Sequence, residues 1–432
     1  MHESPKSDKV EILFVPSESS QTPQQHHAPA LFAVLVLPYA FTTSVTVLLM
    51  PYLLRKHGIS VDRISSIVVV ANLPLIWSFL WSPLADLGLR KRSWVFCSAL
   101  GASLAGGAAI LSVQGSQVLL TALLFLMSAF GGLLSSACGA LLTAMAVELR
   151  GHAAGWYQGG NTGGIALGGG LFIWLADHAS LPAVASATMA AMLLPALAAL
   201  RIEEPPLVRR GIRPELKGLV HDMKGILGSR RTWIGLVFLL SPVGSAAIGN
   251  LISGMGPDYH ASGNTVLWVT GIGGGLLSAL GCFMGGVVAD KIGRMFSYAL
   301  AGGLAALFGV YMAFASATPF TYAVGYSGYA VSAGFAFAVY TAMVLDILGR
   351  RKYAAASGYA VLNSAGNLPI AYMTWLDGLG YRQGGARGLM ATDAAANGGF
   401  GIVLLLVAIF LGSQRRWVSQ ENGRNSSGCA RI

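Results

Sequence analysis

Residues 82–92 read SPLADLGLRKR, and residues 286–294 read GVVADKIGR. The two stretches share the pattern Ala-Asp-x-x-x-Arg, and Asp290 lies 204 residues after Asp86. Each stretch follows the second long apolar run of its own half of the chain. A short charged loop that recurs at equivalent places indicates a membrane chain built from two related halves.

The regions around these loops are strongly apolar. Hydrophobic residues make up 54% of the 432-residue chain, charged residues only 11%, and the mean hydropathy is +0.62. Soluble domains carry about 25% charged residues. The few charges gather in short clusters between runs long enough to cross a bilayer, which takes ~20 residues of helix. The chain is therefore predicted to be an integral membrane protein, in contact with a lipid bilayer and with little room for a soluble domain.

The apolar runs predict an all-α fold of twelve transmembrane helices in two pseudo-symmetric six-helix bundles, 31–200 and 233–413. The helices of the first bundle are expected at 31–54, 64–85, 94–113, 118–147, 155–176 and 180–200. Those of the second are expected at 233–256, 265–289, 296–316, 320–347, 355–376 and 398–413. The densely charged segment 201–232 is predicted to be the linker between the bundles.

The distribution of basic residues predicts the orientation. With the N-terminus in the cytoplasm, 23 of the 28 Lys and Arg fall on the cytoplasmic side, as the positive-inside rule requires. The five on the outside are Arg55, Lys56, Arg63, Arg382 and Arg387. The polar segment 1–30 is then a disordered cytoplasmic tail, and 414–432 is a second cytoplasmic tail. We expect a bacterial inner (plasma) membrane, and we ascribe the net charge of +10 to topology rather than to nucleic-acid binding.

The chemistry-bearing residues argue against an enzyme. The four cysteines show neither a disulfide framework nor a zinc-ligand spacing, so no metal or other cofactor is predicted. The eight histidines are dispersed among tails and loops rather than clustered at one membrane face. A catalytic membrane site would require such a cluster.

The second charged loop resembles the signature loop of the major facilitator superfamily, G-x-x-x-D-[RK]-x-G-[RK]. The first copy departs from that pattern, with Ser82 for the leading Gly and Leu87 for the basic residue. The resemblance implies a secondary transporter that moves a small-molecule substrate by alternating access, usually as a monomer. It also implies that the motif Asp caps a neighbouring helix and pairs with basic residues to hold the cytoplasmic side shut.

By this resemblance the gating residues are Asp86, Arg90, Asp290 and Arg294. Glu148 and Asp346 occupy matching places at the ends of the fourth and tenth predicted helices, and they are candidates for the same set. Each of these two residues is followed by a predicted helix that opens with a Gly-aromatic pair. The alternative interpretation is that these are solvated loop charges that fix topology.

Residues 79–94 and the GWYQ stretch at 155–158 resemble the branch that contains AmpG-type muropeptide permeases and acetyl-CoA transporters. That branch handles cell-wall fragments, CoA thioesters and siderophores. Muropeptide permeases often carry two more helices than the twelve predicted here. A drug, metabolite or siderophore transporter of the same fold, or a membrane sensor that no longer transports, is the alternative.

The predicted substrate cavity is neutral. No Asp, Glu, Lys or Arg lies in the middle third of any predicted helix, so no central carboxylate relay is expected. The candidate cavity residues are the mid-helix polar residues Tyr39, Thr43, Asn72, Gln158, Asn161, Asn250, Tyr340, Asn363 and Asn367. A buried amide needs a hydrogen-bond partner, which another helix or a solute can supply. As a set they favour a sugar-like, amphipathic or drug-like solute over a bare ion.

Overall fold

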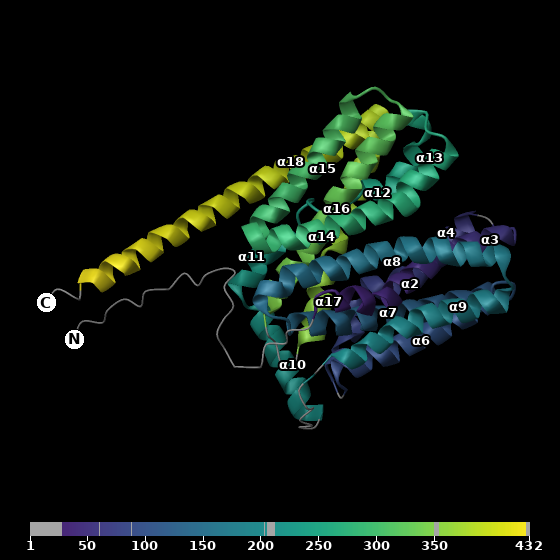
Figure 1. The fold of residues 1–432 in the computed structure, drawn as a ribbon, viewed down its shortest axis with the longest axis horizontal. Helices are drawn as coiled ribbons and strands as arrows, with labels where there is room; N and C mark the ends of the chain where they lie inside the picture. Colours follow the sequence, from purple (N-terminus) through teal and green to yellow (C-terminus); the bar gives the residue numbers. More distant parts are fainter. Residues whose placement is uncertain are drawn as a thin grey trace.

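The structure is a computed structural model that describes residues 28–59, 61–87, 89–202, 204, 212–349 and 354–428. Nearly all of the predicted N-terminal tail lies outside these residues. The described chain is helical throughout, in two bundles that lie one above the other in Figure 1.

The first bundle begins with two interrupted rods. The first is made of α1 (Leu31–Leu35), α2 (Leu37–Ser44), η1 (Val45–Leu49) and α3 (Met50–Lys56). The second is made of α4 (Val61–Ile76), α5 (Ser78–Trp81) and η2 (Ser82–Asp86). The others are α6 (Lys91–Leu111), α7 (Gln117–Thr143), η3 (Val147–Leu149) with α8 (Arg150–His178), and α9 (Leu181–Leu193) with η4 (Leu194–Arg201).

The predicted linker contains the helix α10 (Ile212–Leu227), which leads into the second bundle. The first rod of the second bundle is broken between α11 (Arg230–Leu239) and α12 (Ile248–Leu251). Its second rod joins α13 (Gly263–Trp268), η7 (Val269–Gly273) and α14 (Gly274–Ile292). There follow α15 (Arg294–Phe314), α16 (Pro319–Leu348), α17 (Ala355–Ala365) and α18 (Asn367–Gly428).

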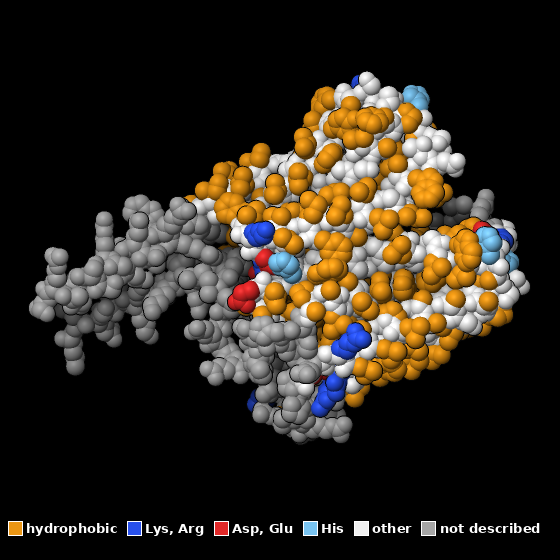
Figure 2. Space-filling model, in the orientation of Figure 1, with side chains coloured by type: hydrophobic (Ala, Val, Ile, Leu, Met, Phe, Trp, Pro, Cys, Tyr) orange, Lys and Arg blue, Asp and Glu red, His pale blue; other side chains and the backbone are white. Residues whose placement is uncertain are grey.

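Eight helical stretches of the described chain are long and apolar enough to cross a membrane, and the bent pair Ile67–Leu75 and Ser78–Asp86 makes a ninth. One of the eight, Ala355–Phe410, changes direction at Gly384–Gly385, where the backbone leaves helical geometry, and so supplies two limbs. With α8 and the broken α11–α12 rod, the described residues form twelve rods, six in each half. Figure 2 shows hydrophobic side chains over the sides of both bundles in this view, with charged side chains gathered toward the two ends. The all-helical membrane fold is thus confirmed.

The predicted helix boundaries need one important correction. The twelfth helix was expected at 398–413, but its limb of α18 starts directly after Gly385. Gly380 and Gly388 lie so close that a Cβ on Gly388 would come within 2.2 Å of the Gly380 carbonyl oxygen. Small residues thus allow the two limbs of α18 to pack tightly, and a stretch that reads as a Gly-rich loop is helical.

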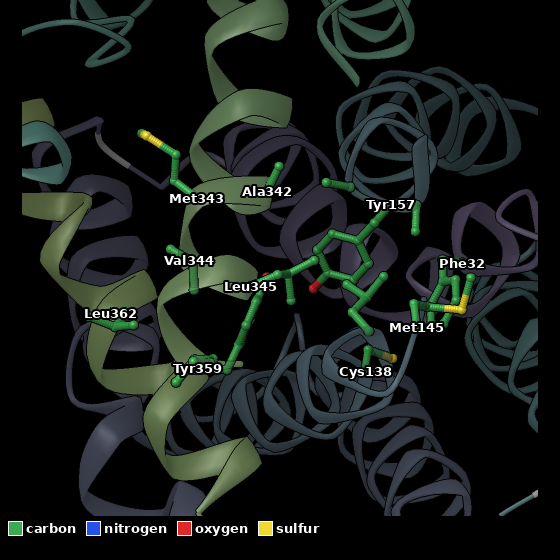
Figure 3. Close-up of a cluster of buried hydrophobic side chains, with 14 of the residues drawn as sticks. Phe32, Cys138, Met145, Tyr157, Ala342, Met343, Val344, Leu345, Tyr359 and Leu362 are labelled. Atoms are coloured by element: carbon green, nitrogen blue, oxygen red, sulfur yellow. The ribbon is translucent and has the colours of Figure 1, made fainter. Parts of the chain in front are cut away.

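The two halves share a core at one end only. One buried cluster joins first-half residues such as Phe32, Cys138 and Tyr157 to second-half residues such as Leu345 and Tyr359 (Figure 3). A second cluster contains only residues between Val45 and Met192, and a third only residues between Ile248 and Met390. The shared cluster lies at the end that carries the 82–92 and 286–294 loops, which we call the motif end. The halves are therefore packed together at the motif end and have separate cores toward the opposite end, where they diverge in Figure 1.

Candidate transport site and gate

The second motif loop holds the start of α8. The Asp290 carboxylate, at the end of α14, accepts hydrogen bonds from the backbone N–H groups of Gly151 (3.0 Å) and His152 (2.9 Å). It also contacts the His152 ring, and the Arg294 guanidinium lies 2.6 Å away. The first N–H groups of a helix lack partners within the helix and carry partial positive charge, so a carboxylate there is stabilising. A Cβ on Gly151 would lie 2.1 Å from a carboxylate oxygen, so glycine permits this approach.

The first motif loop holds the start of α17 in the same way. The Asp86 carboxylate accepts hydrogen bonds from the N–H groups of Ala356 (2.9 Å) and Ser357 (2.7 Å) and from the Ser357 hydroxyl (2.6 Å). Its ion pair is with Lys91, at 2.7 Å, rather than with the predicted Arg90. Arg90 instead occupies the extended position just before α6.

Both motif carboxylates bridge the two halves of the protein. Asp86 belongs to the first half and caps a helix of the second, whereas Asp290 belongs to the second half and caps a helix of the first. These bonds exist only while the halves are together at the motif end. Charge-assisted hydrogen bonds of this kind are stronger than neutral ones and can be made or broken by helix movement.

A buried arginine adds a third bridge that the sequence did not predict. Arg150 is 1% exposed and donates to the carbonyl oxygens of Thr143 (3.1 Å) and Leu345 (3.2 Å). Its guanidinium also lies 3.5 Å from the Asp346 carboxylate, which in turn accepts from Arg294 at 3.2 Å. Asp346, one of the predicted gating candidates, thus contacts both Arg150 and Arg294.

Glu148 does not join the described bridges. It is exposed on η3, and no ion pair to it is found among the described residues. Arg150, two residues later, takes the buried position because it opens α8, which begins five residues before the predicted start at 155. The sequence feature that could have indicated this role is the position of Arg150 directly before the Gly-rich stretch of α8.

Glycines bring α8 and α14 into backbone contact across the halves. A Cβ on Gly155 would come within 2.8 Å of the Cys282 carbonyl oxygen, and a Cβ on Gly286 within 2.5 Å of the Gly151 carbonyl oxygen. Gly164 and Gly168 instead face their own half, where a Cβ would meet α2 side chains. Small residues on α8 therefore serve both static packing and the contact between the halves.

A cavity of ≈ 250 Å³ lies between the halves, beyond the shared core. Its walls come from α2, α7 and α8 on one side and from α11, α15, α16, α17 and α18 on the other. Six of the predicted cavity residues line it: Tyr39, Gln158, Asn161, Tyr340, Asn363 and Asn367. Tyr157 and Tyr359 of the shared core also line it, so that core forms the floor of the cavity.

Three predicted cavity residues are not among those that line this wall. The Thr43 hydroxyl donates to the Tyr39 carbonyl oxygen at 3.4 Å, and the Asn250 amide donates to the Thr374 hydroxyl at 3.0 Å. Asn72 is half-buried on α4. The assignment of these three residues to the cavity is therefore not supported by its lining.

One buried acceptor at the cavity wall has no hydrogen-bond donor among the described residues. The Gln158 amide donates to the Thr341 hydroxyl of the other half at 2.7 Å, and the Asn161 amide donates to the Gln158 carbonyl oxygen at 3.3 Å. The Asn161 carbonyl oxygen is buried without a hydrogen-bond donor among the described residues. Such an atom at a cavity wall suits a donor group of a solute, because an unpaired buried acceptor is costly.

Two buried carboxylates were missed in the sequence. Asp377 and Asp393 lie on the two limbs of α18, and each side chain is 0% exposed. Both fall in the segment 377–397 that was read as an outside loop. The length of the predicted twelfth helix could have shown that this segment is helical. Its 16 residues would span only ~24 Å of a bilayer core that is ~30 Å thick, so the helix must begin earlier.

The comparisons with known proteins agree with this architecture. A family model described as Major Facilitator Superfamily matches residues 32–374. No curated protein matches the chain. Among solved structures, the transporter FucP in the outward conformation has a TM-score of 0.61 at 16% identity, and the match covers 87% of this chain and 98% of that one.

Two other solved structures are similar at the same level. The human organic anion transporter MFSD10 has a TM-score of 0.63 at 15% identity, covering 87% of this chain and 98% of its own. The proton:xylose symporter XylE has a TM-score of 0.65 at 13% identity, covering 89% and 94%. At such identities these likenesses show the fold alone. The family match spans most of the chain. The chain therefore belongs to the major facilitator superfamily, as a non-enzymatic secondary transporter of that family.

Proposed function

We propose that this protein carries an uncharged or amphipathic solute, rich in hydroxyl or amide groups, through the cavity between its halves. The observation that carries this proposal is the wall of that cavity. It is built from both halves, and its polar groups are amides, hydroxyls and phenols. Such groups recognise hydrogen-bonding solutes without the strong preference for an ion that a charged pocket would have.

The geometry supports a cycle in which access alternates between the two ends. The structure is closed at the motif end by the shared core, the two motif carboxylates and Arg150. Breaking these bridges would let the halves rock about the cavity and expose it at the motif end. Because most Lys and Arg flank that end, we propose that it faces the cytoplasm, with both termini on that side.

For the substrate, we propose a sugar-containing cell-wall fragment or a solute of similar chemistry. This rests on the neutral amide-rich wall and on the resemblance of 79–94 to the muropeptide-permease branch. A siderophore, drug or metabolite is the second candidate, and a CoA thioester the least suited, because its phosphates would meet no basic side chain on the cavity wall as described.

The test is uptake into proteoliposomes, with and without an imposed pH gradient. The panel holds an anhydro-muropeptide, a neutral sugar, a siderophore and acetyl-CoA, with protein-free liposomes as the control. We expect accumulation of the muropeptide or the sugar and none of acetyl-CoA. Accumulation of acetyl-CoA instead would contradict the neutral-solute assignment, and no transport of any panel member in either direction would favour the sensor alternative.

Replacing Asn161 by Leu is expected to raise the KM of the transported solute roughly 10- to 100-fold. The solute donor loses its acceptor and is left unpaired in the cavity, which costs about 1–3 kcal/mol. The control is Asn72→Leu, which makes the same change in the same bundle but away from the cavity wall, and its KM should stay near the wild-type value. If both variants weaken uptake equally, Asn161 does not contact the solute.

A further inference from the structure

The carboxyl groups of Asp377 and Asp393 occupy an unusual environment within the second bundle. The Asp393 carboxylate accepts from the Tyr329 hydroxyl of α16 at 3.2 Å and from the Asn397 amide at 3.0 Å. Asp377 interacts electrostatically with Asp393, yet neither of its oxygens has a hydrogen-bond donor among the described residues. No Lys, Arg or His of the described chain pairs with either group.

An ionised carboxylate in this position would be very unfavourable. Moving it out of water without a donor or a cation costs many kcal/mol, and a second negative charge beside it adds to that cost. A neutral carboxyl group avoids both the cost of burying a charge and the repulsion from the second carboxylate. The surroundings of Asp377 therefore favour a bound proton, while the two donors at Asp393 stabilise the single remaining negative charge.

We infer that Asp377 and Asp393 form a proton-binding pair, which takes up and releases one proton in each transport cycle. This assignment deepens the proposed function and rests on it for the link to solute movement. In chemical terms, the O–H bond of one carboxyl group forms or breaks, and the proton is exchanged with water reached from the central cavity. The pair carries one negative charge with the proton bound and two without it.

A small cavity lies between the donors of Asp393 and the wall of the solute site. It has a volume of ≈ 10 Å³, about the room that a single water needs, and is lined by Tyr329 and Asn397, the two donors to Asp393. Gly244 lines both this cavity and the central one. It lies in the break between α11 and α12 and has a φ of +77°. Non-helical backbone at membrane depth is expected only where it is covered by protein or lines a cavity, and here it separates the two spaces.

One rod connects the pair mechanically to the gate. Ala356 and Ser357, at the start of α17, are capped by Asp86, and Asp377 follows about 20 residues later, on the first limb of α18. Between them Asn363, Gly366 and Asn367 line the solute cavity. A change of charge at Asp377 therefore acts on the rod that carries both the cavity wall and a gating contact.

A sodium site is less well supported by the same contacts. The Asn397 amide and the Tyr329 hydroxyl present donors to Asp393, whereas a cation needs oxygen lone pairs on every side. No group of three or more acidic, His or Cys side chains suited to a metal ion occurs in the described part of the chain. The test therefore includes sodium as a competing outcome.

The first experiment needs no solute. The infrared carbonyl band of protonated carboxyl groups is followed in the purified full-length protein as the pH rises from about 4 to about 9. We expect a band that persists above the range of ordinary carboxyl groups, is absent from Asp377→Asn, and shifts its midpoint in Tyr329→Phe. The control Asp258→Asn removes an exposed carboxylate in the connection between α12 and α13, and it should leave the band unchanged.

Three outcomes would overturn the assignment. They are the absence of such a band in the wild-type protein, its survival in both Asp377→Asn and Asp393→Asn, and its displacement by sodium chloride but not by choline chloride. Because the wild-type titration decides the first and third, a variant that fails to fold leaves the test intact.

The second experiment links the pair to transport. With the solute identified by the panel, Asp377→Asn is expected to lose accumulation driven by a pH gradient and to keep solute exchange across the membrane at equal pH. Gradient-driven accumulation at the wild-type level would overturn the coupling role. A titrating band in a protein that transports none of the panel would instead refute the proposed function and leave the proton site standing.

Discussion

Replacing Asp290 by Asn is expected to lower solute transport roughly tenfold or more without unfolding the protein. The carboxylate holds the first two N–H groups of α8 from the opposite half and also pairs with Arg294. Hydrogen bonds to a charged group contribute about 1.5–3 kcal/mol each, and ~1.4 kcal/mol is enough for a tenfold change in the balance between two states. The asparagine keeps one acceptor oxygen, but it turns an amide donor toward N–H groups and the guanidinium.

The conformational effect can be measured separately from transport. Cys282 is buried where α14 meets α8, four residues before Gly286. In a background in which the other three cysteines are replaced, Asp290→Asn should raise the rate at which a water-soluble thiol reagent labels Cys282. The exposed Asp258→Asn serves as the charge-matched control and should change neither transport nor labelling. Normal transport with unchanged labelling in Asp290→Asn would refute the gating role.

The repeated loops made the fold predictable from the sequence because they place charge at fixed points in a very apolar chain. Asp86 and Asp290 can lie at equivalent helix ends only if the surrounding runs form two similar bundles. The residues that donate hydrogen bonds to these carboxylates, Gly151 and Ala356, could not be identified in the same way. They lie across the interface between the halves, and their contribution is a backbone N–H that any residue type except proline carries.

The buried carboxylates were missed for a different physical reason. Hydropathy weighs composition, and 377–397 combines two arginines, two acidic residues and five glycines, as a loop would. The segment is helical nonetheless, because Gly380 and Gly388 let the two limbs of α18 touch, and the packed limbs bury both carboxylates. Asp393 and Asn397 are four residues apart, on one face of a helix, and this spacing becomes informative once the helix is recognised.

Six residues of the candidate cavity were predictable for a simple reason. Polar residues in the middle of apolar helices must find partners. Gln158 donates to Thr341 across the halves, and Asn161 donates to Gln158 at the cavity wall. The direction of each side chain depends on how its helix is rotated. Asn250 shows this, because α12 follows a break in its rod and its amide is bonded to Thr374 outside the cavity wall.

Replacing Arg150 by Ala is expected to abolish transport and to lower the stability of the closed state by about 3–5 kcal/mol, the range for breaking a buried ion pair. The guanidinium joins Thr143 of its own half to Leu345 and Asp346 of the other. Arg150→Lys should have an intermediate effect, because an ammonium group cannot reproduce the planar fork that reaches both carbonyl oxygens.

The neighbouring Glu148→Gln is the matched control. Its side chain is exposed and makes no ion pair among the described residues, so we expect a change of less than about 0.5 kcal/mol and normal transport. Thermal unfolding in detergent measures the stability, and uptake into proteoliposomes measures the transport. A larger effect of Glu148→Gln than of Arg150→Ala would contradict this assignment. It would mean that the acidic residue, which the internal repeat matches to Asp346, carries the contact between the halves.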